Sequence, residues 1–272
     1  MRLRTNKASW RLSAFVLAAP FFIVALAPLS AQAETPFQAS QRFIETGQTT
    51  EARRTLESEL RIRPDNVEAR YNLAILLEQA GHKSDAISLY RENFATSRHL
   101  PSLANLASAL KESGKTTEAQ QWLEKGTTVL KHEATPWYML AAISEQQGNI
   151  TQATTQHRKA LKADPLNGYA YLHYAAFQSR HKLADHGIKQ GDKATRLLPD
   201  CAPCWRMYGD ILRYSRMQQK ALTAYQRSLA IDPSKQTRQQ LISTLRSLGY
   251  KQRADQIQRG LDAESNLKPE SK

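Results

Sequence analysis

The stretch NVEARYNLAILLEQAGHKSDAISLYRENFAT, residues 66–96, contains two helical patterns separated by a glycine. Over Asn66–Ala80 the apolar residues recur with helical spacing and give the segment a broad apolar face. Gly81 interrupts this pattern, and Asp85–Thr96 carries a second apolar stripe. The stretch therefore predicts two antiparallel helices joined by a tight turn, which is a helical hairpin.

The same pattern recurs along the chain with a period of 33 or 34 residues, which is typical of a repeat protein. Each unit has a turn glycine, a small residue five positions later and, in four units, a proline seventeen positions after the turn. The fifth and sixth units have Lys182 and Arg216 in place of the glycine. The turn glycines are Gly47, Gly81, Gly114, Gly148 and Gly249, the small residues are Ala52, Ala86, Ala119, Ala153, Gly187, Ala221 and Ala254, and the prolines are Pro64, Pro165, Pro199 and Pro233.

These recurring residues have physical roles in a helical hairpin. A small side chain lets two helix axes approach closely, and a proline stops a helix because it has no backbone N–H. The fifth unit has both Gly187 and Gly191 in its second helix. Because glycine is a poor helix former, we expect that helix to be weaker than the others.

The sixth unit reads Trp205-x-x-Tyr208-Gly209-x-x-Leu212, followed by Ala221, Tyr225, Ser228 and Pro233. This pattern resembles the tetratricopeptide repeat (TPR), a helix-turn-helix unit of about 34 residues. The resemblance, together with the signal segment described below, is to an exported bacterial TPR protein. It implies an all-α fold, a right-handed α-solenoid of about seven TPR helical hairpins over residues 34–267. The expected units are 34–66, 67–99, 100–133, 134–167, 168–201, 202–234 and 235–267.

The resemblance also implies a place for a ligand. TPR arrays hold a peptide or a partner helix in a concave groove that is lined by the first helix of each hairpin. Carried over by helical spacing, this gives a candidate peptide-binding groove formed by Tyr71, Ile75, Glu78, Lys111, Tyr138, Glu145, Arg180, Arg206, Asp210, Arg213 and Arg246.

Charge is unevenly distributed along the chain. The formal net charge is +13, and residues 134–272 hold 21 basic and 11 acidic side chains. The candidate groove is basic at its C-terminal end, so we expect an acidic segment or a C-terminal carboxylate to dock there. The alternative is that these charges only solvate the surface and attract anions diffusely. An anionic membrane surface is a further candidate contact, and no nucleic-acid-binding motif is present.

Two cysteines occur, in Cys201-Ala-Pro-Cys204. In an oxidising compartment such a pair favours a small structural disulfide, with a redox pair or a metal site as alternatives. Covalent haem attachment would require a histidine directly after Cys204, where Trp205 stands. Zinc would require two further ligands, and the nearby histidines lack ligand spacing. We therefore predict no cofactor and no metal.

The N-terminus has the features of a signal peptide over residues 1–33. Four basic residues precede a charge-free apolar stretch, which ends in Ala31-Gln32-Ala33. We expect cleavage after Ala33 and a periplasmic protein; the alternative is a retained membrane anchor. The polar C-terminal residues 268–272 are expected to be a disordered tail.

No nucleophile elbow, phosphate-binding glycine loop or paired-carboxylate site is recognisable in the sequence, so we expect no enzymatic activity. The function predicted is a periplasmic scaffold or adaptor that binds a protein segment and supports assembly of an envelope complex. Pilus, secretion, polysaccharide-export and cytochrome c maturation machineries are complexes that related exported proteins serve. The alternative is a holdase or assembly chaperone with a broad range of clients. The sequence leaves the oligomeric state open.

Overall fold

The computed structural model describes residues 34–266, and side chains are described as far as residue 260. The chain divides into two units, Met1–Thr35 and Pro36–Lys272, and all described helices belong to the second. The predicted signal peptide at 1–33 and the predicted tail at 268–272 lie outside the described residues. Of the helices within residues 34–266, none combines the length and the apolar content needed to cross a membrane.

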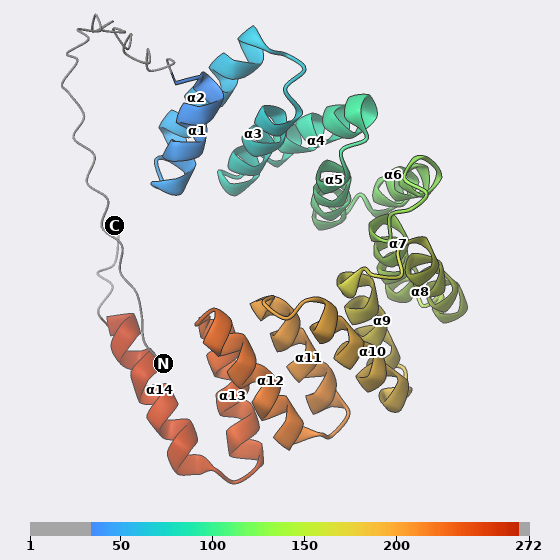
Figure 1. The fold of residues 1–272 in the computed structure, drawn as a ribbon, viewed down its shortest axis with the longest axis vertical. Helices are drawn as coiled ribbons and strands as arrows, with labels where there is room; N and C mark the ends of the chain where they lie inside the picture. The colour runs from blue at the N-terminus through green and yellow to red at the C-terminus, as the bar shows by residue number, and fades with distance from the viewer. Residues whose placement is uncertain (1–33, 267–272) are drawn as a thin grey trace, which may run out of the picture. The chain divides into compact units, whose positions relative to one another are not determined.

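Residues 34–266 form only α-helices and short connections, with no strand among them. Each odd-numbered helix, here called a first helix, packs against the even-numbered second helix that follows it, and each hairpin packs against the next (Figure 1). This order confirms the predicted all-α solenoid of seven helical hairpins in the described range. The helices are α1 (Pro36–Glu45), α2 (Thr49–Ile62), α3 (Val67–Gln79), α4 (Lys83–Ser97), α5 (Leu100–Glu112), α6 (Thr116–Val129), α7 (Thr135–Gln146), α8 (Ile150–Ala163), α9 (Gly168–Arg180), α10 (Ala184–Leu197), α11 (Ala202–Tyr214), α12 (Gln218–Ile231), α13 (Lys235–Ser247) and α14 (Lys251–Asn266).

The turns inside the hairpins require a left-handed backbone. The five turn glycines have φ between 73° and 85°, a region that costs little only for glycine. Lys182 and Arg216 adopt the same conformation, with φ of 62° and 59°. Packing of the two helices therefore imposes this turn even where the sequence supplies a side chain that resists it.

The small residue after each turn lies where two helices are closest. All six alanines at this position are completely buried. At Gly187 an added Cβ would lie 2.8 Å from the carbonyl oxygen of Ala175, and at Gly191 it would lie 2.5 Å from the ring of Tyr208. The two glycines do not shorten the helix, because α10 has 14 residues, as α8 and α12 do. The lower helix propensity of glycine remains a prediction about the stability of α10.

Side-chain caps fix where several first helices begin. The Asn66 side chain accepts a hydrogen bond from the Ala69 N–H, and Asn167 does the same for the Ala170 N–H. Cys201 occupies the equivalent position before α11. These residues satisfy backbone donors that have no partner within the helix, so the first helices start at defined points and present their side chains in a fixed register.

The apolar faces of the helices form cores between successive hairpins. Tyr90 and Phe94 are fully buried in the core of hairpins two to four, and Tyr225 has the same role near the C-terminal end. Trp122 packs against the first of these cores. The indole N–H of Trp205 donates to the Pro199 carbonyl oxygen over 2.8 Å. These cores hold the first helices in place, and other side chains of the first helices line the cavities described below.

Candidate functional site

The first helices α5, α7 and α9 contact one another in sequence and enclose a cavity of about 340 Å³. We call it the α5–α9 cavity. Most of its wall is apolar, and its charged side chain is Lys111. The lining residues are Ala104, Ala107, Ser108, Lys111, Leu123, Tyr138, Met139, Ala142, Ile143 and His173.

Tyr138 and His173 form one wall of the α5–α9 cavity. Their rings stack with centroids 4.5 Å apart and planes 8° from parallel. Burial lowers the pKa of His173 to about 4, and the nearby positive charge of Arg180 acts in the same direction. The imidazole is therefore neutral at pH 7 and adds to the apolar, aromatic character of the wall.

Lys111 is exposed at this cavity, and no ion pair or hydrogen bond of its ammonium group is found within the described residues. Glu145 occupies the same repeat position as Lys111, three residues before the turn. Its carboxylate accepts hydrogen bonds from Arg180 and contacts the ring of His181, over 2.8 to 2.9 Å. Burial alone would raise the pKa of Glu145, but these hydrogen bonds outweigh it and hold the pKa below its usual value. Lys111 therefore keeps its charge available to a ligand.

A second cavity, of about 380 Å³, lies between α9, α11 and α13; we call it the α9–α13 cavity. The Asp210 carboxylate lies between two guanidinium groups, 3.6 Å from Arg206 and 3.9 Å from Arg213. The hydroxyl of Tyr225 donates to the same carboxylate over 2.7 Å. One carboxylate thus faces two cations, which leaves an excess of positive charge. The lining residues are Ala176, Ser179, Arg180, Arg206, Met207, Asp210, Ile211, Arg213, Tyr214 and Gln240.

The predicted basic end of the groove is less basic than the sequence indicates. Arg180 makes a two-pronged pair with Glu145, and Arg246 pairs with Asp255 of α14 over 3.1 Å. Of the four arginines, only Arg206 and Arg213 share one acid between them. The correction follows from partners on neighbouring helices, which a count of charges along the sequence does not reveal.

The N-terminal candidates serve mainly to pack one hairpin against the next. The Asn105 amide donates to the hydroxyls of Tyr71 and Tyr90, each over 3.3 Å. The Tyr90 hydroxyl donates to the Glu78 carboxylate over 2.9 Å, and Ile75 packs against the core. The structure therefore brings Lys111 and Tyr138 together at one cavity and Arg180, Arg206, Asp210 and Arg213 at the other, while Tyr71, Ile75 and Glu78 lie outside both.

Two family profiles, both described as Tetratricopeptide repeat, match residues 43–92 and 100–129. The chain is a tetratricopeptide repeat protein. The crystal structure of a tetratricopeptide repeat protein from Parabacteroides merdae ATCC 43184 is similar, with a TM-score of 0.58 and 17% identity over 86% of this chain and 93% of that one. A chain of the APC/C hetero-tetramer Cut9-Hcn1 has a TM-score of 0.56 and 16% identity, over 77% of this chain and 42% of its own length. No curated protein matches this sequence.

Three residues that line the two cavities of this TPR array were missing from the sequence prediction. Apart from Arg180, the candidate set followed positions three, six and ten residues before each turn. Met139, His173 and Met207 lie nine residues before their turns and line the two cavities. Leu172 lies ten residues before its turn, as Tyr138 and Arg206 do, but it is only 2% exposed and belongs to the core. Testing this adjacent position along the repeats could have found the missed residues.

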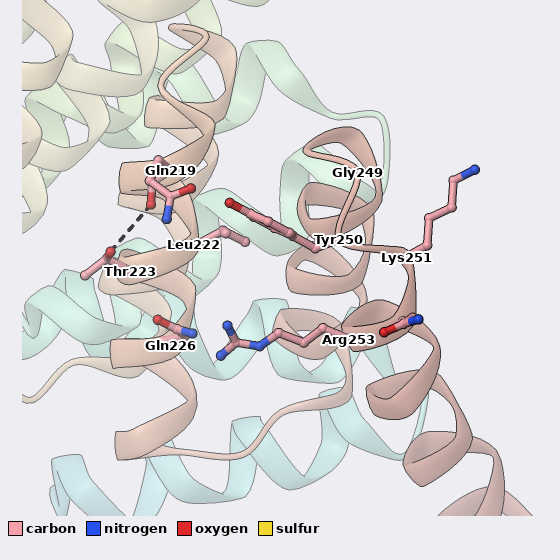
Figure 2. A pocket seen from close by; sticks show the side chains of 9 residues that line it. Gln219, Leu222, Thr223, Gln226, Gly249, Tyr250, Lys251 and Arg253 are labelled. Atoms are coloured by element: carbon pink, nitrogen blue, oxygen red, sulfur yellow. Dashed lines mark hydrogen bonds between the residues drawn. The ribbon is translucent and has the colours of Figure 1, made fainter.

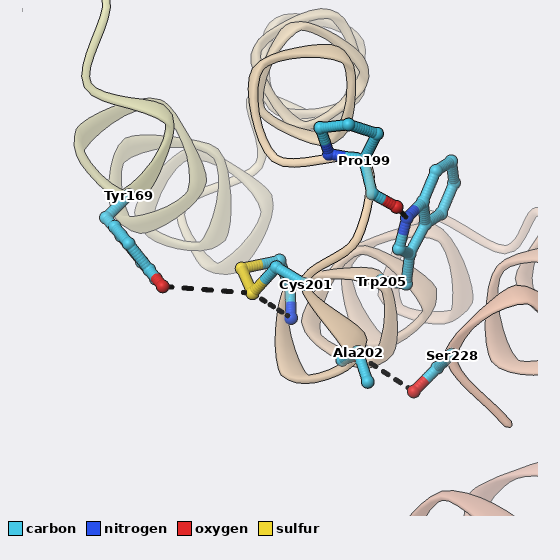
Figure 3. The surroundings of a disulfide bond; sticks show 7 residues. Tyr169, Pro199, Cys201, Ala202, Trp205 and Ser228 are labelled. Carbon is cyan, nitrogen blue, oxygen red and sulfur yellow. Dashed lines mark hydrogen bonds between the residues drawn. A yellow bond between two sulfur atoms is a disulfide. The ribbon is translucent and has the colours of Figure 1, made fainter. Parts of the chain in front are cut away.

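Cys201 and Cys204 are joined by a disulfide at the N-terminus of α11 (Figure 3). Cys204 is buried, while Cys201 is half-buried and its sulfur lies 3.9 Å from the Tyr169 hydroxyl. In this TPR array the disulfide links the capping residue of a first helix to the third residue of that helix. Among residues 34–260 no cluster of His, Cys, Asp or Glu has the arrangement of a metal site.

Proposed function

We propose that this protein is an exported, non-enzymatic adaptor that binds one segment of a partner protein along its first helices. The α5–α9 cavity carries the proposal, because it combines an apolar wall with an unpaired cation at its edge. A volume of about 340 Å³ accommodates one or two bulky apolar side chains. TPR arrays in general use surfaces of this kind to bind proteins.

The proposed segment carries an apolar anchor and acidic side chains. The anchor would occupy the α5–α9 cavity, where Tyr138 and Met139 supply contact area. An acidic side chain would pair with Lys111, and a second would reach Arg206 and Arg213, whose shared carboxylate leaves positive charge uncompensated. Such a partner fits a role in assembling an envelope complex.

Crosslinking from inside the cavity tests this proposal. A photoreactive amino acid in place of Ala142 should capture one partner through one segment, whereas the same group in place of Lys125, on a second helix, should not. The R206Q/R213Q pair should weaken capture, while R246Q, which removes a cation already paired with Asp255, should not. Equal capture from both positions would refute a first-helix site, and capture of many unrelated unfolded proteins would indicate the holdase.

Export is tested separately through the N-terminus. If residues 1–33 form a cleaved signal peptide, the periplasmic protein should begin at Glu34, and A33R should block processing because the peptidase accepts only small residues there. N-terminal sequencing of the fractionated protein reads this directly. A cytoplasmic protein that keeps Met1 would overturn the proposed location.

A further inference from the structure

A cavity of about 550 Å³ lies between the second helices α12 and α14, away from the first-helix cavities. In Figure 2, the ring of Tyr250 extends toward Leu222 and the guanidinium of Arg253 extends toward Gln226, whereas Lys251 points away from α12. The lining contains two cations and no acid. The remaining polar side chains in the wall are neutral amides and the hydroxyls of Thr223 and Tyr250.

Another pair of adjacent second helices in this chain is bridged by an ion pair. Arg91 of α4 and Glu118 of α6 form an ion pair of 2.7 Å between adjacent second helices. Arg91 lies ten residues after its turn and Glu118 four residues after the next turn. The residues at these two positions in the last two hairpins are Gln226 and Arg253. Arg253 therefore has the neutral amide of Gln226 at the equivalent position, whereas Glu118 has the oppositely charged Arg91.

The guanidinium of Arg253 has no ion pair or hydrogen bond within the part of the chain that the structure describes. By contrast, Arg246, just before the same turn, is paired with Asp255. A guanidinium presents two parallel N–H donors, which match the two oxygens of a carboxylate. Arg253 is therefore a cation set opposite neutral hydrogen-bonding groups, without an internal acid to occupy it.

The other groups in the wall suit a ring bearing hydroxyls. Tyr250 is 50% exposed, and the negative face of its ring favours contact with C–H groups that carry partial positive charge. Gln219, Thr223 and Gln226 offer both donors and acceptors, which pair with neighbouring hydroxyls. The cavity volume lies within the range of small-ligand sites.

We propose that the cavity between α12 and α14 binds a carboxylated sugar of the uronate class. Arg253 holds the carboxylate, Tyr250 lies against the sugar ring, and the amides of Gln219 and Gln226 bind its hydroxyls. This site shares no lining residue with the first-helix cavities, so the proposal does not depend on whether those cavities bind a protein segment.

Titration of the purified protein with trigalacturonate, followed by NMR or calorimetry, tests the proposal. Trigalacturonate should bind saturably, and neutral trigalactose and the peptide Glu-Glu-Glu should bind at least about tenfold more weakly, because each lacks one half of the recognised chemistry. R253Q should weaken trigalacturonate binding by about tenfold or more, since a charge-assisted hydrogen-bond pair is lost. R259Q, an equal change of charge at an exposed site on the same helix, should leave binding unchanged.

Q226E provides the sharper variant, because it places a carboxylate opposite Arg253 as Glu118 stands opposite Arg91. The internal acid should occupy the guanidinium and reduce uronate binding as much as R253Q does. Both changes are at exposed positions, and circular dichroism checks that the helices persist. The proposal is overturned if trigalacturonate fails to bind, if Glu-Glu-Glu binds as tightly, or if R259Q weakens binding as much as R253Q.

Discussion

Two buried histidines should make this protein lose stability between pH 6.5 and pH 5. His157 is only 2% exposed, and its ring packs against Tyr174 and Phe177. Burial lowers the pKa of His157 to about 3 and that of His173 to about 4, from an ordinary value of 6.5. The neutral rings therefore stabilise the fold fully above pH 6.5. As the pH falls below 6.5 the unfolded chain takes up protons that the folded chain refuses, so this contribution is lost progressively toward the folded pKa values.

The size of the loss follows from the linkage relation. Each refused proton costs about 1.4 kcal/mol per pH unit, so His157 accounts for about 2 kcal/mol between pH 6.5 and 5, and His173 for up to about the same. Glu59 and Glu145 also have lowered pKa values, but their ordinary value of 4.5 places their effect mainly below this window. Urea denaturation followed by circular dichroism at the two pH values measures the difference.

A matched variant separates the two histidines. H157L replaces the imidazole by an apolar side chain that does not titrate, and it should remove about half of the pH dependence. The H157L/H173F pair should remove most of it. Equal unfolding free energies of the natural protein at pH 6.5 and 5 would refute the burial argument. So would an unchanged slope in the double variant.

Three further changes test the packing. G187A should lower stability by about 1–3 kcal/mol in urea denaturation, because its Cβ would meet the Ala175 carbonyl oxygen. G260A, in open space on α14, should raise stability by up to about 1 kcal/mol. A stabilising G187A would contradict the close approach of the two helices. K182G should raise stability by up to about 1 kcal/mol by relieving the left-handed turn, with K189G, a helix-interior change, expected to lower it. E145Q should lower the melting temperature, since Arg180 and His181 lose a charged partner worth about 1–3 kcal/mol, and high salt should reduce the difference from the natural protein.

Local physics along the chain was sufficient to predict the hairpins. A left-handed turn at Gly81, a small residue at Ala86 and a stop at Pro64 act on the residues beside them, and the same signals recur in each unit. Where two units lack the turn glycine, at Lys182 and Arg216, the five others preserved the register. The helix type and the number of hairpins could therefore be predicted without coordinates.

The composition of the site depended on contacts between hairpins. Glu145 is paired with Arg180, 35 residues away, while Lys111 at the same repeat position has no partner among the described residues. Gly187 weakens a helix in isolation but fits against Ala175 in the folded array. Such outcomes depend on side chains from neighbouring repeats meeting within a few ångströms. The period of the sequence therefore determined the scaffold, whereas the tertiary structure alone decided which charges remain available for binding, because ion pairing depends on distance in space and not along the chain.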